Sequence, residues 1–126
     1  MIVVGLQPNG RFDPSFGRHG LLRHRVFDMQ PTAMALYHGM PIVAGWTGDR
    51  RGAHLASMEL TRFTAQGRID RSFGRKGVVR TAIGKEAFAE TVAVQRNGDI
   101  LVGGAANVGK DRVPILARYL SGAGRH

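Results

Sequence analysis

The residue types best suited to chemistry gather in an eight-residue stretch that occurs twice in the chain. The copies read Asp-Pro-Ser-Phe-Gly-Arg-His-Gly at residues 13–20 and Asp-Arg-Ser-Phe-Gly-Arg-Lys-Gly at residues 70–77, so they begin 57 residues apart. The carboxylate and hydroxyl in each copy are residue types that calcium and glycan sites use. One carboxylate, however, is far short of the oxygen ligands that a hard cation takes.

The same residue types also build tight turns, and we interpret the repeated stretch in this way. Asp and Ser side chains accept hydrogen bonds from backbone donors in turns, and Gly adopts a positive φ at no steric cost. The Phe between them is expected to pack between neighbouring units. The predicted turn residues are Gly10, Asp13, Ser15, Phe16, Gly17, Gly20, Gly67, Asp70, Ser72, Phe73, Gly74 and Gly77.

Residues 104–111, Gly-Ala-Ala-Asn-Val-Gly-Lys-Asp, match a phosphate-binding loop up to its last position. There Asp111 replaces the hydroxyl that would hold magnesium, and its charge repels phosphate. No helix is predicted to follow and present its N-terminus. We therefore expect no nucleotide or other cofactor at this segment.

The histidines show no spacing typical of a metal site. His19 and His24 are close enough in sequence to meet across a turn, but two ligands without a carboxylate partner make an incomplete site. We expect solvated histidines and no metal. The five are His19, His24, His38, His54 and His126.

The composition predicts a globular, turn-rich protein that attracts anions. The chain has 126 residues, 43% hydrophobic residues, 18 glycines, no cysteine and a net charge of +9. A positive excess of this size attracts nucleic acid, acidic glycans or anionic lipid surfaces whatever the fold. The basic residues are spread along the chain, so a solvated Arg-rich surface is the alternative to a dedicated polyanion site. No apolar run reaches the roughly 20 residues of a membrane span, and no signal peptide is recognised.

Short β-branched, partly alternating runs predict strands in two successive units. Tight turns are expected at His38-Gly39 and at Asn97-Gly98, the latter as a two-residue hairpin turn. Longer polar connections are expected at residues 47–52 and 107–112. The predicted strands are residues 21–27, 32–37, 41–46, 55–63, 78–83, 91–95, 100–104 and 114–119.

Four short antiparallel strands per unit, repeated in tandem, are typical of β-propeller blades. The prediction is an all-β fold with about two blades in one repeat region, residues 1–126. Residues 1–31 form the last two strands of a partial blade, residues 32–84 a full blade, and residues 85–126 a blade without its last strand. A third copy of the segment before the octapeptide, at residues 115–126, ends where the next octapeptide would begin. We expect the blades to be completed by a missing remainder of the chain or by self-association of about three or four copies into a closed ring.

These motifs resemble the bacterial delta-60 repeat over nearly the whole chain. The second unit fits the pattern closely, whereas the first departs from it at residues 37–40, Tyr-His-Gly-Met. The resemblance implies a propeller-forming repeat of bacterial, often cell-envelope or secreted, proteins with no general activity assigned. The matching residues are 116–119, Gly67, Asp70, 72–74, Gly77, 95–98 and 100–104.

The sequence thus predicts a non-catalytic scaffold or binding module for a protein or glycan partner. The alternatives are a polyanion binder that uses the basic residues, and an enzyme with a site in a central channel, for which Glu90 and Tyr37 are too few. Trp46 is expected to pack between units, with the loop face as the alternative. The candidate ligand-binding residues are Trp46, Arg50, Arg51, Lys110 and Arg112.

Overall fold

The computed structural model describes residues 1–24, 29–48 and 56–121. In these ranges the protein is all-β, with three antiparallel sheets and no helix. The strands are β1 (Ile2–Val4), β2 (Leu21–Arg23), β3 (Met29–Tyr37), β4 (Met40–Gly48), β5 (Ala56–Arg62), β6 (Val78–Thr81), β7 (Glu86–Val94), β8 (Ile100–Val108) and β9 (Asp111–Tyr119).

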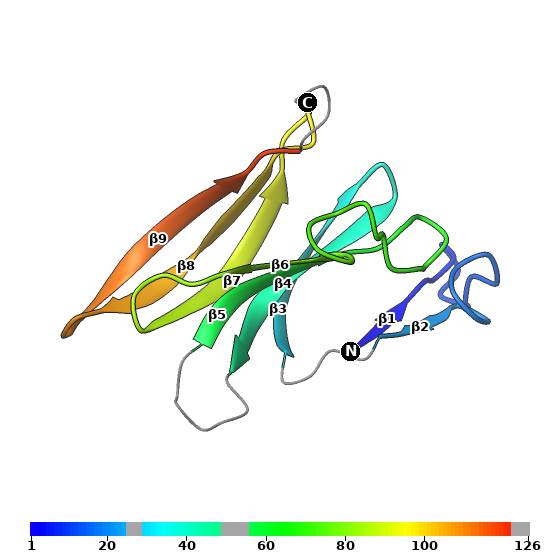
Figure 1. Cartoon of the computed structure of the whole chain (residues 1–126). Coiled ribbons are helices and arrows are strands. Elements are labelled where there is room, and N and C mark those ends of the chain that lie inside the picture. Colours follow the sequence, from blue (N-terminus) through cyan, green and yellow to red (C-terminus); the bar gives the residue numbers. More distant parts are fainter. Residues whose placement is uncertain (25–28, 49–55, 122–126) are drawn as a thin grey trace.

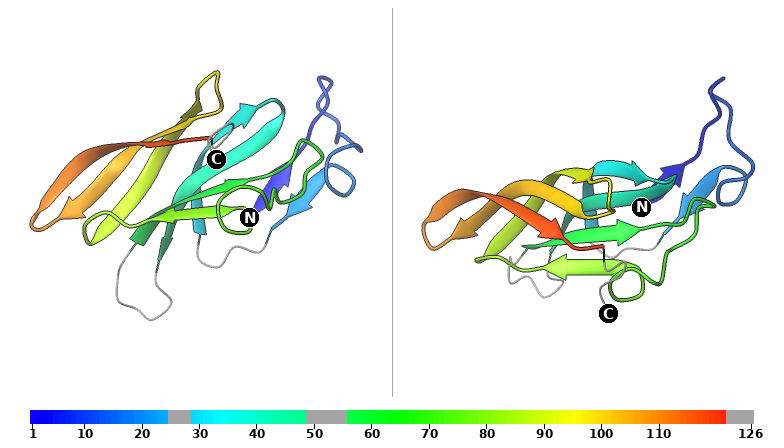
Figure 2. Two further views of the ribbon diagram at one scale, coloured as in Figure 1. Left: turned by 45° about the horizontal axis from the view of Figure 1, so that its top comes forward. Right: turned by 90° about the horizontal axis from the view of Figure 1, so that it is seen from above.

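Each sheet is a meander in which strands that follow one another in sequence lie side by side. The sheets have the orders β1-β2, β3-β4-β5-β6 and β7-β8-β9, and the four-stranded sheet lies between the other two (Figure 1). Two further views show the same succession of layers (Figure 2). The expectation of an all-β fold made of antiparallel strands is confirmed.

Two apolar layers hold the sheets together. One lies between the β3–β6 and β7–β9 sheets and contains Ile42, Leu60 and Val102, each about 1% exposed. The other joins the β1–β2 pair to the β3–β6 sheet through Val3, Phe16, Met29, Val43 and Phe63. Both sides of the β3–β6 sheet are therefore packed, which explains the nearly continuous burial of β4 and β5.

Hydrogen bonds also cross the interface between the β3–β6 and β7–β9 sheets. The Thr32 hydroxyl donates to the Ala89 carbonyl at 2.6 Å, and the hydroxyls of Thr81 and Tyr119 lie 2.7 Å apart. The Tyr37 hydroxyl donates to the Arg96 carbonyl at 3.2 Å. These bonds fix the register of one sheet on the other, because a hydrogen bond tolerates less displacement than an apolar contact.

Two local predictions were wrong in their geometry. His38 and Gly39 both have a positive φ, so this turn, and not Asn97-Gly98, is the two-residue primed turn. At Asn97-Gly98 only Gly98 has a positive φ, and the Gln95 amide donates to the Asp99 carbonyl, which closes a longer loop. Residues 107–112 were predicted to be a longer polar connection. In the structure β8 runs to Val108 and β9 starts at Asp111, so a tight turn joins the two strands.

The strand bounds differ from the predicted ones in other places. β3 begins at Met29, before the predicted unit boundary at residue 32, and β7 begins at Glu86, before the predicted strand start at residue 91. Pro41 is the second residue of β4, whereas the first position was expected. Residues 25–27 and 55 of the predicted strands lie outside the described residues.

Candidate anion-binding pockets

Two pockets lie at equivalent places in the repeat, where the octapeptide enters the last strand of a unit. One, of about 650 Å³, is lined by Gly74, Arg75, Lys76, Val78, Val79 and Arg80. The other, of about 700 Å³, is lined by Gly17, Arg18, His19, Leu21, Leu22, Arg23, Gly67 and Arg68. Every lining residue of the first pocket has a counterpart 57 positions earlier in the second.

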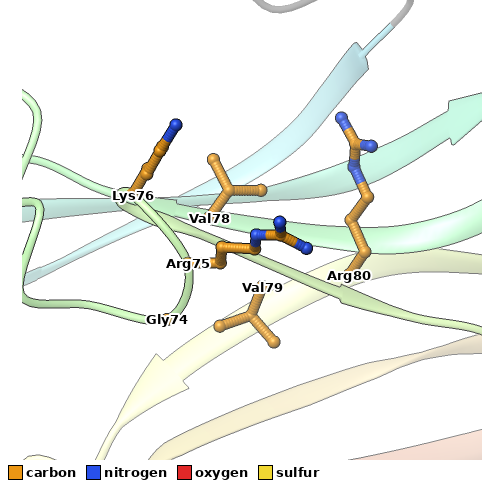
Figure 3. Close-up of a pocket in the computed structure, with 6 residues that line it drawn as sticks. All are labelled: Gly74, Arg75, Lys76, Val78, Val79 and Arg80. Atoms are coloured by element: carbon orange, nitrogen blue, oxygen red, sulfur yellow. The ribbon is translucent and has the colours of Figure 1, made fainter.

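The pocket at β6 is lined by three cationic side chains and by two valines. Figure 3 shows Lys76, Val78 and Arg80 projecting from one side of β6 and Val79 from the other, with the Arg75 side chain extending along the strand. Among the described residues, no carboxylate lines either pocket. Each therefore carries a local positive potential that attracts an anionic group.

A buried carboxylate orients one of these cations. Glu59 on β5 is fully buried, and its Oε2 accepts a hydrogen bond from Arg80 Nε at 2.9 Å. The Arg80 side chain is 60% exposed, so the rest of its guanidinium remains available at the pocket. In the other pocket Arg23 pairs with Ile2 in the strand register, as Arg80 pairs with Glu59, so this cation lacks the same anchor.

Glu59 and Thr61 depart from the repeat, and inspection of single motifs did not find them. Glu59 Oε1 and Thr61 Oγ1 are buried without a hydrogen-bond partner among the described residues. The corresponding residues are apolar in the other two copies, Ile2 and Val4 in the first and Ile115 and Ala117 in the third. Aligning the three copies position by position would have revealed the substitution.

The octapeptide residues lie in the turns as predicted. Asp70 Oδ1 accepts hydrogen bonds from the Ser72 amide at 3.0 Å and the Ser72 hydroxyl at 2.6 Å. Asp13 makes the same two bonds with Ser15, and these bonds lower the pKa of Asp13. Positive φ angles occur at Gly10, Gly17, Gly20, Gly67, Gly74 and Gly77.

Asp70 has a further partner. Its Oδ2 accepts a hydrogen bond from Arg62 Nε at 2.8 Å. Burial opposes ionisation of Asp70, but the bonds from Ser72 and the charge of Arg62 together outweigh it and lower the pKa. Phe16 packs between the β1–β2 and β3–β6 sheets, and Phe73 packs on the core that faces β7–β9.

Two of the predicted ligand-binding residues, Trp46 and Arg112, lie against the same ring, that of Phe88. Trp46 lies in β4 with its ring edge-on to Phe88 of β7 at 5.2 Å, which places it between two sheets. Arg112 lies in β9, with its guanidinium 5.3 Å from the Phe88 ring and 3.8 Å from Glu90. Lys110 is exposed in the β8–β9 turn. Arg50 and Arg51 lie outside the described residues.

The other chemical candidates have structural contacts. Residues 104–111 form the end of β8, a tight turn and the start of β9, so they are a hairpin and not a phosphate loop. His24 lies edge-on to Phe63 at 5.5 Å, and burial lowers its pKa. His54 and His126 fall outside the described residues. In the described ranges, no three His, Cys, Asp or Glu side chains are grouped to hold a metal ion.

Comparisons of the chain with protein-family models, curated proteins and solved structures found no match. Within the described residues, no helix has the length and apolar character to cross a membrane. The pockets therefore have to be interpreted from their own geometry and charge.

Proposed function

We propose that the chain is a non-catalytic binding module built of delta-60-type β-propeller blades, and that its repeated basic pockets bind an acidic polysaccharide. The observation that carries the proposal is the equivalence of the two pockets, residue by residue, at a spacing of 57 positions. A polymer with regularly spaced charges engages such a series of sites at once, and each further site raises the apparent affinity without a new kind of contact.

Three features of the sheets support the assignment to propeller blades. Each sheet is a simple meander, successive sheets pack face to face, and the octapeptide turn precedes the last strand of both the β1–β2 and β3–β6 sheets. Propeller blades are four-stranded meanders arranged in this way around an axis. By this assignment β3–β6 is a full blade, β1–β2 contains the last two strands of a blade and β7–β9 the first three. The delta-60 resemblance further implies a bacterial cell-envelope or secreted protein.

The lining of the pockets favours an acidic polysaccharide over nucleic acid. Proteins that bind single-stranded nucleic acid combine basic grooves with aromatic side chains on which the bases stack. In the part of the chain that the structure describes, no Phe, Tyr or Trp side chain lines either pocket. Arginine and lysine beside small apolar residues suit carboxylate and sulfate groups that project from a sugar chain.

Binding of fluorescently labelled heparin and polygalacturonate, measured by anisotropy, tests the proposal. Affinity should fall at least about tenfold between about 50 and 200 mM salt, because counterions are released on binding. Replacing Arg75 and Lys76 together by alanine should weaken binding about tenfold at low salt. The matched control replaces Arg96 and Lys110, which are likewise exposed in turns but lie outside both pockets.

Equal weakening by the control pair would show that net charge, and not the pockets, attracts the polymer. Flat salt dependence, or equal affinity for a neutral polysaccharide, would exclude an electrostatic site. Tighter binding of single-stranded DNA than of either acidic polysaccharide would show that nucleic acid, and not a polysaccharide, is the preferred ligand.

A further inference from the structure

An arginine, an aspartate and a phenylalanine close the turn after β5. Arg62 Nε donates to Asp70 Oδ2 at 2.8 Å, and the two side chains are only 16% and 14% exposed. The Arg62 guanidinium also lies over the Phe73 ring, 4.6 Å from its centroid. Arg62 therefore fastens the octapeptide turn to the strand that precedes it.

The first copy of this turn lacks its arginine. The Asp13 amide donates to the Gly5 carbonyl at 2.8 Å, just as the Asp70 amide donates to the Arg62 carbonyl at 2.9 Å. Gly5 therefore occupies the position of Arg62. The side-chain bonds of Asp13 are those with Ser15, and no cation pairs with it among the described residues.

The β9 strand has the complementary arginine. Arg118 pairs with Leu101 in the strand register, as Arg62 pairs with Ile42. The segments align residue by residue, with Arg118 and Tyr119 at the positions of Arg62 and Phe63. Arg118 is exposed and has no carboxylate partner in the described part of the chain. Within the described ranges, one copy of the chain thus holds an arginine without its aspartate and an aspartate without its arginine.

The strand edges match in the same way. β5 pairs with β6 on one side, whereas the corresponding edge of β9 carries no strand among the described residues. β2 is the counterpart of β6, and among the described residues it pairs with the three-residue strand β1. β9 aligns with β5, which pairs with all four residues of β6, so it offers β2 an equivalent partner.

We infer that β9 of one copy replaces β1 in a second copy, pairs with the β2 strand there and brings Arg118 to Asp13. The resulting sheet has four strands, and Arg118 occupies the place where Gly5 now stands. Phe16 packs closely against Gly5, so it has to adopt the position under the guanidinium that Phe73 has in the second unit. The inference depends on the equivalence of the units and does not require the pockets to bind an anion.

The same association buries two exposed apolar sets. Leu116 on β9 is 77% exposed, whereas its counterpart Leu60 on β5 is 1% exposed because the next sheet covers it. Met34 and Leu36 on β3 are 56% and 62% exposed, and their counterparts on β7 are Val92 and Val94, which pack against the preceding sheet. The exposed faces of β9 and β3 therefore correspond to the two faces that meet between the β3–β6 and β7–β9 sheets within the chain. The partner that covers them in this inference is a second copy of the chain.

A pair of charge reversals tests the inference by multi-angle light scattering. The wild type should have a mass several times the single-chain mass of 13.7 kDa. Arg118→Asp and Asp13→Arg should each reduce the mass to that of one chain, because like charges then meet at the contact. An equimolar mixture should raise the mass above that of one chain again, because the aspartate introduced by Arg118→Asp in one variant then meets the arginine introduced by Asp13→Arg in the other and the two variants alternate along the assembly.

Three controls separate assembly from folding. Circular dichroism should show a β-sheet spectrum for every variant. Arg96→Asp makes the same charge change in an exposed turn and should keep the wild-type mass. If Asp13→Arg does not fold, Asp13→Asn retains an acceptor for Ser15, and it should raise the dissociation constant of the assembly about tenfold. A monomeric wild type, an unchanged mass for Arg118→Asp, or a mixture of folded variants that stays monomeric would each overturn the inference.

Discussion

Asp70 shows how a residue that resembles a catalytic or metal-binding carboxylate is explained by the turn that it closes. Its Oδ1 accepts both bonds from Ser72, and its Oδ2 accepts the bond from Arg62. Both oxygens are therefore engaged within the chain. The charge on Asp70 stabilises the fold, because its pKa is lower in the folded protein than in the unfolded chain.

Asp70→Asn should lower the free energy of unfolding at pH 7 by about 1–3 kcal/mol, since a charge-assisted bond is lost while the side-chain shape is kept. A depressed pKa stabilises above the unfolded value of about 3.9, and this contribution disappears as pH falls below it. The difference in melting temperature between wild type and variant, measured by scanning calorimetry from pH 7 to pH 3, should therefore shrink toward acid.

A double-mutant cycle provides the control for this prediction. Arg62→Met removes the other partner, and the combined variant should lose less stability than the sum of the two single losses. Additive losses, or a difference between wild type and Asp70→Asn that does not change with pH, would contradict a stabilising ion pair.

At the scale of elements, the strand pairs β3–β4 and β7–β8 each contain a bulge, and a glycine in the second strand of the pair accommodates it. The register shifts between Pro31 and Ala33 in β3 and between Ala89 and Thr91 in β7. Gly45 and Gly104 face these bulges, and a Cβ at either position would collide with a backbone carbonyl, of Gln30 and Phe88 respectively. These glycines are therefore required by close approach of two strands.

Gly104→Ala should lower the free energy of unfolding by about 1–3 kcal/mol or more, because a backbone carbonyl cannot move aside as a side chain can. Gly48→Ala is the matched control, since it lies in the equivalent strand β4 with open space around its Cβ position. Urea denaturation measures both. Equal stability of the two variants would show that the bulge relaxes and that the close approach is not a constraint.

At this scale the sequence predicted the β-strands and the octapeptide turns, because β-branched runs and the turn residues of the octapeptide are local signals. Strand ends were less predictable: Asp111 and Arg112 are polar yet belong to β9, because the strand pairs along an exposed edge that tolerates charge. The pockets were not predicted, since Arg80 is held by Glu59 across the β5–β6 pairing, a contact that sequence spacing alone does not reveal.

At the scale of the whole molecule, the chain presents a layered stack with unlike ends. The outer β7–β9 sheet exposes Leu116 on β9, and the middle sheet exposes Met34 and Leu36 on β3. A contact between unlike surfaces generates a closed ring if the rotation per copy closes, and an open filament if it does not. Under the proposed assignment to propeller blades, successive sheets are inclined to one another about a common axis, so a ring is expected.

Electron microscopy of the assembled protein tests this central claim most directly. Class averages viewed along the axis should show a closed ring of about six to eight radial blades around a central channel, formed by about three or four copies. Particles of single chains at micromolar concentration, or open filaments without closed rings, would contradict the assignment of these sheets to the blades of a self-assembled propeller.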